Sequence, residues 1–313
     1  MSLAFVFPGQ GSQAVGMGQA LAEAFPVARH ILQEVDDALE QHLSRLMFEG
    51  PEEELRLTAN AQPALMAASL AALRVFEQEG GRPLAERAAF VAGHSLGEYS
   101  ALAAAGALEL ADTARLLRRR GEAMQEAVPV GEGAMAALLG LELDAAEEIA
   151  QEAAEDQVCA AANDNAPGQV VLSGHREAID RAIELAKGRG AKRAIQLPVS
   201  APFHCSLMAP AADVMADALA TVGIKMPAVP LVANVTASRL SDPDEIRRKL
   251  VEQVTGKVRW RESVVYMASQ GVETTVELGA GKVLTGLSKR IDRSLGAVAA
   301  GTPEELETLL QQL

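Results

Sequence analysis

Two short segments of the chain hold residue types that together could perform nucleophilic catalysis. Residues 93–97 read Gly-His-Ser-Leu-Gly, which places Ser95 in a Gly-x-Ser-x-Gly pattern. His204 lies in a proline-bounded segment, "LPVSAPFHCSLMAP". A serine hydroxyl is a poor nucleophile at neutral pH and needs a base to take its proton. A Ser95–His204 pair would therefore suit acyl transfer or acyl hydrolysis.

The other histidines are weaker candidates for the base. His30 and His42 lie in helical patterns, His175 follows a strand in a turn, and the side chain of His94 should point away from its neighbour Ser95. His204 remains by elimination. The third member of the site stays open, because several aspartates lie between Ser95 and His204 and a backbone carbonyl could orient the histidine equally well.

Ser95 also has a structural interpretation. Glu98 follows it by three residues, and S-x-x-E at a helix start is the pattern of a capping box. The surroundings favour catalysis, because an apolar run leads in and an Ala/Leu-rich stretch leads out, as in a nucleophile elbow. Gly93 and Gly97 leave room for a strained serine. The amide of Leu96, at the helix N-terminus, could then bind an oxyanion.

Two further segments carry groups that could bind a ligand. Gln10, in "PGQGSQ", follows the first expected strand at the edge where open α/β sheets bind ligands, although a plain tight turn is the alternative. No Gly-Lys-Ser/Thr follows, so the segment is not a phosphate loop. Arg118, Arg119 and Arg120 stand before Gly121. One or two of them could point inward and clamp a carboxylate, or all could favour the last turn of a helix.

The elements that must position these residues follow an α/β order. "LAFVF" and "AAFVAG" are expected strands, and helical patterns fill roughly 17–48, 62–79 and 110–128. "VPLVANVT" and "TTVELGAG" are expected to be further strands of the same sheet. This order predicts an α/β fold with a parallel sheet.

The pattern changes near residue 128. From 128 to 198 the expected order is strand, helix, two strands with a polar "DNAPG" loop between them, helix and strand. This is the ferredoxin-like order. The sequence therefore predicts a ferredoxin-like small domain, 128–198, inserted into a large domain formed by 1–127 and 199–313.

Composition excludes several classes of protein. The net charge of −14 over 313 residues argues against nucleic acid as a partner. No apolar run is long enough to span a bilayer, and no signal peptide is recognised. Cys159 and Cys205 have no metal-binding spacing and are expected to be reduced thiols in the cytoplasm. We expect no metal and no cofactor.

Several linked motifs resemble those of a known enzyme family. "FVFPGQGSQAVGMG", "GHSLGEYSAL", "RRRGEAMQEAVP", "GQVVLSG", "FHCSLM", "LVEQVTGKVRW" and "GAGKVLTGLSKRI" stand in the order seen in malonyl-CoA:acyl carrier protein transacylases of bacterial fatty acid synthesis. The resemblance covers nearly the whole chain. It implies an α/β-hydrolase-like large domain and ping-pong transfer of malonyl from malonyl-CoA to the pantetheine thiol of holo acyl carrier protein. The enzyme would be a cytoplasmic monomer.

The resemblance also implies roles for individual residues. Ser95 would carry the malonyl group, and His204 would be its base. Gln10 and the Leu96 amide would form the oxyanion hole. Arg120 would hold the malonyl carboxylate, which would make the enzyme selective for malonyl over acetyl groups.

Other positions follow from the same resemblance. Gln253, in "LVEQV", would orient His204 in place of an acid. Asn163 and Asn165 fall where the family has asparagines near the cleft, with no assigned role. Phe203 departs from many bacterial members, which have a small residue before the histidine. In related polyketide synthase acyltransferase domains a phenylalanine there accompanies selection of malonyl over methylmalonyl, so unbranched malonyl is expected.

The acidic carrier protein would need a basic patch on this acidic chain. The candidates are Lys192, Arg193, Lys282, Lys289 and Arg290. Two rival functions stay open. A serine hydrolase would use the same pair without Arg120 and turn over with water, and a non-catalytic carrier-protein binding module would usually have lost Ser95, His204 or Arg120.

Overall fold

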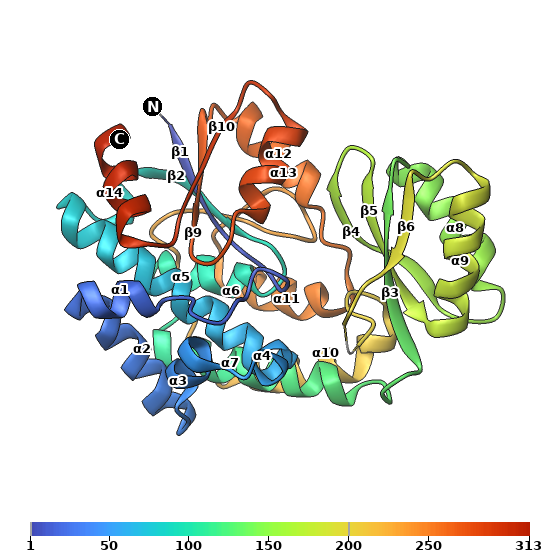
Figure 1. Ribbon diagram of the computed structural model, residues 1–313, viewed down its shortest axis with the longest axis horizontal. Coiled ribbons are helices and arrows are strands. Elements are labelled where there is room, and N and C mark those ends of the chain that lie inside the picture. Colours follow the sequence, from blue (N-terminus) through green and yellow to red (C-terminus); the bar gives the residue numbers. More distant parts are fainter. Residues whose placement is uncertain (1, 200) are drawn as a thin grey trace.

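A computed structural model describes residues 2–199 and 201–313. The chain forms a larger unit with a central sheet and a smaller unit beside it, and both termini lie on the side of the larger unit remote from the smaller one (Figure 1). Within the described residues no helix is long and apolar enough to cross a membrane.

The larger unit is built on a six-stranded sheet in the order β10-β9-β1-β2-β7-β8. Its strands are β1 (Leu3–Phe7), β2 (Ala88–Gly93), β7 (Leu231–Val232), β8 (Arg239–Leu240), β9 (Thr274–Leu278) and β10 (Gly296–Ala300). All neighbours pair in parallel except β7 and β8. The predicted α/β fold with a parallel sheet is confirmed, although β8 and β10 were not predicted and "VPLVANVT" yields only a two-residue strand.

Helices cover both faces of this sheet. They are α1 (Gln19–Ala24), α2 (Pro26–Leu39), α3 (Leu43–Glu49), α4 (Glu52–Arg56), α5 (Thr58–Gly80), α6 (Gly97–Ala104), α7 (Leu110–Glu126), α10 (Ala209–Ala220), α11 (Pro243–Thr255), α12 (Trp260–Ser269), α13 (Val283–Ile291) and α14 (Pro303–Gln312). The helical patterns expected over roughly 17–48 are three helices, α1, α2 and α3.

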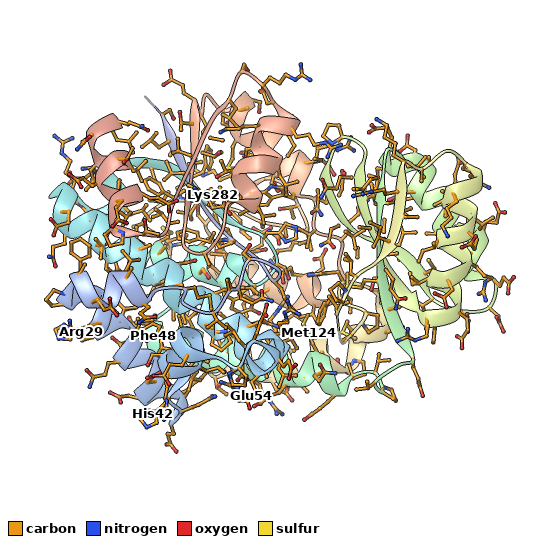
Figure 2. All side chains as sticks on the ribbon, in the orientation of Figure 1. Arg29, His42, Phe48, Glu54, Met124 and Lys282 are labelled. Atoms are coloured by element: carbon orange, nitrogen blue, oxygen red, sulfur yellow. The ribbon has the colours of Figure 1, made fainter. Side chains whose placement is uncertain are left out.

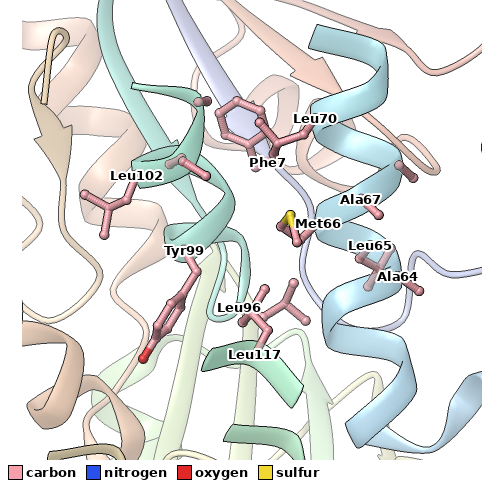
Figure 3. Close-up of a cluster of buried hydrophobic side chains, with 14 of the residues drawn as sticks. Phe7, Ala64, Leu65, Met66, Ala67, Leu70, Leu96, Tyr99, Leu102 and Leu117 are labelled. Carbon is pink, nitrogen blue, oxygen red and sulfur yellow. The ribbon is translucent and has the colours of Figure 1, made fainter. Parts of the chain in front are cut away.

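The central strand β1 separates two apolar cores, because successive side chains of a strand point to opposite faces. Phe5 and Phe7 pack into the core shared with α5, α6 and α7. Val6 packs into the core formed with α12 and α13. Figure 3 shows Phe7 in the first core, with Leu96 from the turn after β2 near Met66 of α5 and with Tyr99 of α6 pointing away from α5. The turn after β2 is thus fixed by core packing.

The smaller unit contains a four-stranded antiparallel sheet in the order β4-β5-β3-β6. Its elements are β3 (Gly133–Leu139), α8 (Leu143–Ala154), β4 (Cys159–Ala166), β5 (Gln169–His175), α9 (Arg176–Gly188) and β6 (Arg193–Gln196). This is the expected order of elements. The expected "DNAPG" loop is shorter, because β4 continues to Ala166 through two irregularities in its pairing with β5.

The smaller unit contacts the larger one through β4. The backbone of Asp164 donates to the carbonyl of Val258 at 2.9 Å, and Val258 donates to the carbonyl of Ala162 at 2.8 Å. The buried carboxylate of Asp164 also accepts from Arg261 at 2.9 Å. These bonds hold Asn163, between them, at the boundary of the two units.

Candidate active site

Ser95 lies on a sharp turn between β2 and α6. Its φ of 53° is in the left-handed region, which costs an ordinary residue about 1–3 kcal/mol and requires support from its surroundings. A side chain at Gly93 would come within 1.9 Å of the Gly97 backbone, and one at Gly97 within 2.2 Å of the Phe7 carbonyl oxygen. The expected strand–turn–helix arrangement is therefore present, and the glycines are required by close backbone contact.

The Ser95 Oγ lies 2.7 Å from Nε2 of His204. On the other side of the ring, Nδ1 of His204 lies 2.9 Å from the Gln253 carbonyl and 3.1 Å from the Gly256 carbonyl. Two carbonyl acceptors require a proton on Nδ1, so neutral His204 has its lone pair on Nε2, facing the serine. Backbone carbonyls thus hold the ring of His204, one of the two possibilities that the sequence left open. Gln253 contacts His204 through its carbonyl and not through its side chain, which accepts from Arg120 instead.

Burial keeps His204 neutral. Only 4% of the residue is exposed, and burial together with the nearby charge of Arg120 lowers its pKa to about 3. The imidazole in the free protein is therefore in the form that can accept a proton throughout the neutral range.

The amide of Ser95 is held by Asn234, which the sequence did not identify. Oδ1 of Asn234 accepts from the Ser95 N–H at 2.8 Å, and Nδ2 donates to the Gly93 carbonyl at 2.7 Å. Asn234 is fully buried and comes just after β7. Its side chain spans the turn and so stabilises the strained serine.

The capping-box interpretation of Ser95 and Glu98 is wrong. No side chain caps α6, and Glu98 points into the interior, where it accepts from the Asn234 N–H at 3.1 Å and from Gln253 Nε2 at 2.8 Å. Burial raises the pKa of Glu98 to about 7. The capping box does not form because the turn at Ser95 directs the first residues of α6, including Glu98, toward the core.

Arg120 is the arginine that points inward. It is 1% exposed, whereas Arg119 is exposed and Arg118 donates outside the site to Asn60 and Gln41. Nη2 of Arg120 lies 3.2 Å from the Ser95 Oγ. The last-turn interpretation is wrong, because α7 continues to Glu126. Gly121 allows the close approach, since a side chain there would come within 2.5 Å of the Ala59 backbone.

The Arg120 guanidinium is held by two glutamine oxygens. Nη1 donates to Gln62 Oε1 and Nη2 to Gln253 Oε1, each at 2.8 Å. Burial is the main cause that lowers the pKa of Arg120. Within the described residues its hydrogen-bond acceptors are neutral, so the buried cation has room for an anionic partner.

Gln10 belongs to the same network. Its Oε1 accepts from the Thr58 hydroxyl at 2.9 Å, and Thr58 accepts from Gln62 Nε2 at 3.0 Å. Its carbonyl end is thereby fixed, and Nε2 is left as a donor. Leu96, before the first turn of α6, offers a backbone N–H where a helix leaves such groups unpaired. Gln62 and Thr58 were not identified from the sequence.

The other histidines make their contacts away from the Ser95 hydroxyl, although His94 lines the same cavity. His94 contacts Asn165 of β4 at 2.8 Å and packs against Trp260, while His175 accepts from the Val158 N–H. His30 and His42 are exposed, and His42 lies at the outer edge of the larger unit (Figure 2). Among residues 2–199 and 201–313 no group of three or more His, Cys, Asp or Glu could hold a metal ion.

The polar groups converge on one cavity of about 340 Å³ at the boundary of the two units. Gln10, Ser95, Leu96, Arg120 and His204 all line it. The apolar part of its wall comes from Met124, Met135, Leu197, Val199 and Phe203, and Asn163 lies on the β4 side. Met124 marks this boundary in Figure 2. The Ser95 hydroxyl, the buried His204 imidazole and the buried Arg120 guanidinium thus face one space that can hold a small anionic acyl group.

Comparison with known proteins agrees with this arrangement. A family model described as an acyl transferase domain matches residues 4–305. The chain is 50% identical over 308 residues to a malonyl CoA-acyl carrier protein transacylase of Escherichia coli, covering 98% of each protein. It is also similar to the crystal structure of an acyl-carrier-protein S-malonyltransferase from Bartonella henselae, with a TM-score of 0.97, 56% identity and coverage of 100% of this chain and 99% of the other.

A third similar structure contains a partner. It is a malonyl-transacylase in complex with a type II polyketide synthase acyl-carrier protein, 45% identical to this chain with a TM-score of 0.97 and full coverage of both chains. A strained serine beside a histidine on a parallel α/β sheet is typical of enzymes that form an acyl-serine, and the matched family model places the chain among the acyltransferases. The chain belongs to the malonyl CoA-acyl carrier protein transacylase family.

Proposed function

We propose that this enzyme moves a malonyl group from malonyl-CoA to the pantetheine thiol of holo acyl carrier protein in fatty acid biosynthesis. The observation that supports it most directly is the arrangement around one atom. Ser95 Oγ has a neutral histidine nitrogen at 2.7 Å and a buried arginine nitrogen at 3.2 Å. The first activates a nucleophile, and the second selects an acyl group that carries a carboxylate.

The reaction begins with proton transfer from Ser95 to Nε2 of His204. The serine oxygen attacks the thioester carbonyl, and the Leu96 N–H and Gln10 Nε2 stabilise the oxyanion. His204 returns its proton to the leaving thiolate of CoA, which leaves malonyl-Ser95. The carrier thiol then enters, gives its proton to His204 and attacks the ester, and Ser95 recovers its proton as the malonyl thioester departs.

Arg120 links substrate binding to the strength of the base. Its charge is one of the causes that lower the pKa of His204. A malonyl carboxylate bound to Arg120 offsets that charge, so the pKa of His204 rises when the correct substrate is present. An acetyl group gives no such compensation and leaves the buried guanidinium without an anionic hydrogen-bond partner.

We infer that the division into domains follows the two sheets. The large domain, 1–127 and 199–313, is α/β-hydrolase-like, and the inserted domain, 128–198, is ferredoxin-like. The strand order β4-β5-β3-β6 with α8 and α9 between strands supports the second assignment. The enzyme acts as a monomer in the cytoplasm.

Intact mass spectrometry after mixing the protein with malonyl-CoA tests the function. One malonyl adduct is expected, absent in Ser95→Ala, stable in water and discharged by holo carrier protein. Free malonate without a lasting adduct would indicate a serine hydrolase. Neither adduct nor turnover would indicate a carrier-protein binding module.

Phe203 is expected to exclude branched acyl groups. It is 8% exposed and lines the cavity beside His204. Removing the ring in Phe203→Ala should raise the rate of acylation by methylmalonyl-CoA relative to malonyl-CoA by about tenfold, the order expected for one methyl group in an apolar pocket. Competition between the two thioesters, read as the ratio of the two Ser95 adducts, measures this. Equal use of both by the unchanged enzyme would contradict the role.

The proposed basic docking patch for the carrier protein can be tested by charge reversal. Lys192, Arg193, Lys289 and Arg290 are exposed, whereas Lys282, labelled in Figure 2, pairs with Glu305 at 2.8 Å and is less available. Arg290 also contacts Gln169 of β5, so the patch extends from α13 to the smaller sheet. Reversing the charge of Lys289 and Arg290, or of Lys192 and Arg193, should raise KM for the carrier about three- to tenfold. Acylation by malonyl-CoA should not change, and equal loss of both steps would count against docking there.

A further inference from the structure

Glu98 is a buried carboxylate that reaches the site only through one intervening residue, Gln253. It is fully buried on α6. Its Oε2 accepts from the Asn234 N–H and from Gln253 Nε2, and its Oε1 has no partner among the described residues. Burying a carboxylate costs free energy of folding, so a buried carboxylate that contacts a side-chain amide requires an explanation.

The amide of Gln253 has only one orientation that satisfies its neighbours. Nε2 donates to Glu98 Oε2 at 2.8 Å and to the Ser95 carbonyl at 2.9 Å, while Oε1 accepts from Arg120 at 2.8 Å. Turning the amide would place N–H against the guanidinium N–H and oxygen against two oxygens. Glu98, which carries only acceptors when ionised, therefore fixes which end of Gln253 faces Arg120.

Arg120 depends on that orientation. Its Nη2 is shared between Gln253 Oε1 and the Ser95 Oγ. Without the glutamine oxygen, this nitrogen would lose the stronger of its two bonds, and the guanidinium would no longer be held beside the serine. Gln62 would then be the remaining amide anchor.

We propose that Glu98 is a positioning residue for substrate selection, which holds Arg120 in place through the side chain of Gln253. The proposal rests on the proposed function, in which Arg120 binds the malonyl carboxylate. Glu98 acts through its acceptor oxygen, and it does not touch the acyl group.

Three variants of Glu98 test the proposal. Glu98→Met keeps the volume and removes the acceptor, so the preference for malonyl-CoA over acetyl-CoA in Ser95 acylation should fall at least about tenfold, as for one hydrogen bond to a charged group. Most of the change should be in KM for malonyl-CoA. Glu98→Gln keeps an oxygen for Gln253 Nε2 and should restore the preference to within about threefold. If Glu98→Met does not fold, Glu98→Asp makes the same test. The aspartate side chain is one methylene group shorter, so its carboxylate does not reach Nε2 of Gln253.

Two further measurements separate positioning from general damage. Labelling of Ser95 by phenylmethylsulfonyl fluoride, which carries no carboxylate, should stay within about threefold in Glu98→Met. Glu277→Met is the matched control, since this buried carboxylate accepts from the N–H groups of Leu284 and Thr285 outside the cavity. It should lower Tm without changing the malonyl preference.

Specific results would overturn the proposal. An unchanged preference in Glu98→Met or Glu98→Asp would do so, and so would equal loss of malonyl transfer, acetyl transfer and Ser95 labelling. Failure of Glu98→Gln to restore the preference would show that the charge, and not the acceptor oxygen, is required. If the unchanged enzyme itself shows no malonyl preference, the proposed function fails and takes this role of Glu98 with it. If the unchanged enzyme shows the preference and Glu98→Met keeps it, only the role of Glu98 fails.

Discussion

Replacing His204 by alanine should lower the rate of Ser95 malonylation by about 10²–10⁴-fold, the usual contribution of a general base. Nε2 of His204 lies 2.7 Å from the serine oxygen, and two carbonyls hold the proton on the opposite nitrogen. Without the ring, the serine proton has no acceptor in this position. Single-turnover acylation, followed by intact mass spectrometry at several times, measures the rate.

His94 provides the matched control. It stands next to Ser95 in the chain, yet its Nε2 contacts Asn165 at 2.8 Å and it makes no contact with the serine oxygen. His94→Ala should therefore reduce acylation less than about tenfold. A comparable loss in both variants would mean that the contact of His204 with Ser95 is not what drives the reaction.

The order of elements was predictable where a buried strand of the larger sheet is a short apolar run followed by a turn. "LAFVF" and "AAFVAG" carry this signal clearly, and both lie in the middle of the sheet. β10, "GAVAA", is small and begins with glycine, so its composition does not distinguish it from a loop. The two-residue strands β7 and β8 are defined only by the pairing of β7 with β2 and of β8 with β7, which a local sequence pattern does not indicate.

The site was predictable only where its residues lie in a pattern with a mechanism. The glycines around Ser95 are required because a Cβ would lie 1.9 Å from the Gly97 backbone at Gly93 and 2.2 Å from the Phe7 carbonyl oxygen at Gly97, so they appear in the sequence as a motif. Asn234 and Gln62 carry no such signal. One follows a two-residue strand and the other lies inside a helix, and only the tertiary structure turns them toward Ser95 and Arg120.

Glu98 shows how a correct local pattern can give a wrong structure. The capping box assumes that the serine is the residue before the helix and that the glutamate turns back to it. Here Ser95 is two residues before α6 with φ of 53°, so its side chain faces the cavity. The glutamate is then free to face the interior, where Asn234 and Gln253 supply its donors. Predictions from the local sequence do not account for a strained backbone conformation such as that of Ser95.

Replacing Arg120 by methionine should abolish most of the preference for malonyl-CoA. The guanidinium is 1% exposed, lies 3.2 Å from the Ser95 oxygen and has only neutral acceptors within the described residues. Binding of a carboxylate by two charge-assisted hydrogen bonds is worth several kcal/mol, so acylation by malonyl-CoA should fall about 10²-fold or more. Acylation by acetyl-CoA should rise, because the acyl group no longer faces a buried cation whose hydrogen-bond acceptors are neutral.

Arg118→Met is the control for this prediction, on the same helix and two residues earlier. Its guanidinium donates to Asn60 and Gln41, away from the cavity, so its loss should leave the ratio of malonyl to acetyl adducts unchanged. The ratio is measured by offering both thioesters together and separating the two adducts by mass. An unchanged ratio in Arg120→Met would remove the arginine from substrate selection. A lower ratio caused only by slower malonylation would mean that the cation attracts malonyl without excluding acetyl, whereas a rise in acetylation would show that its buried charge does both.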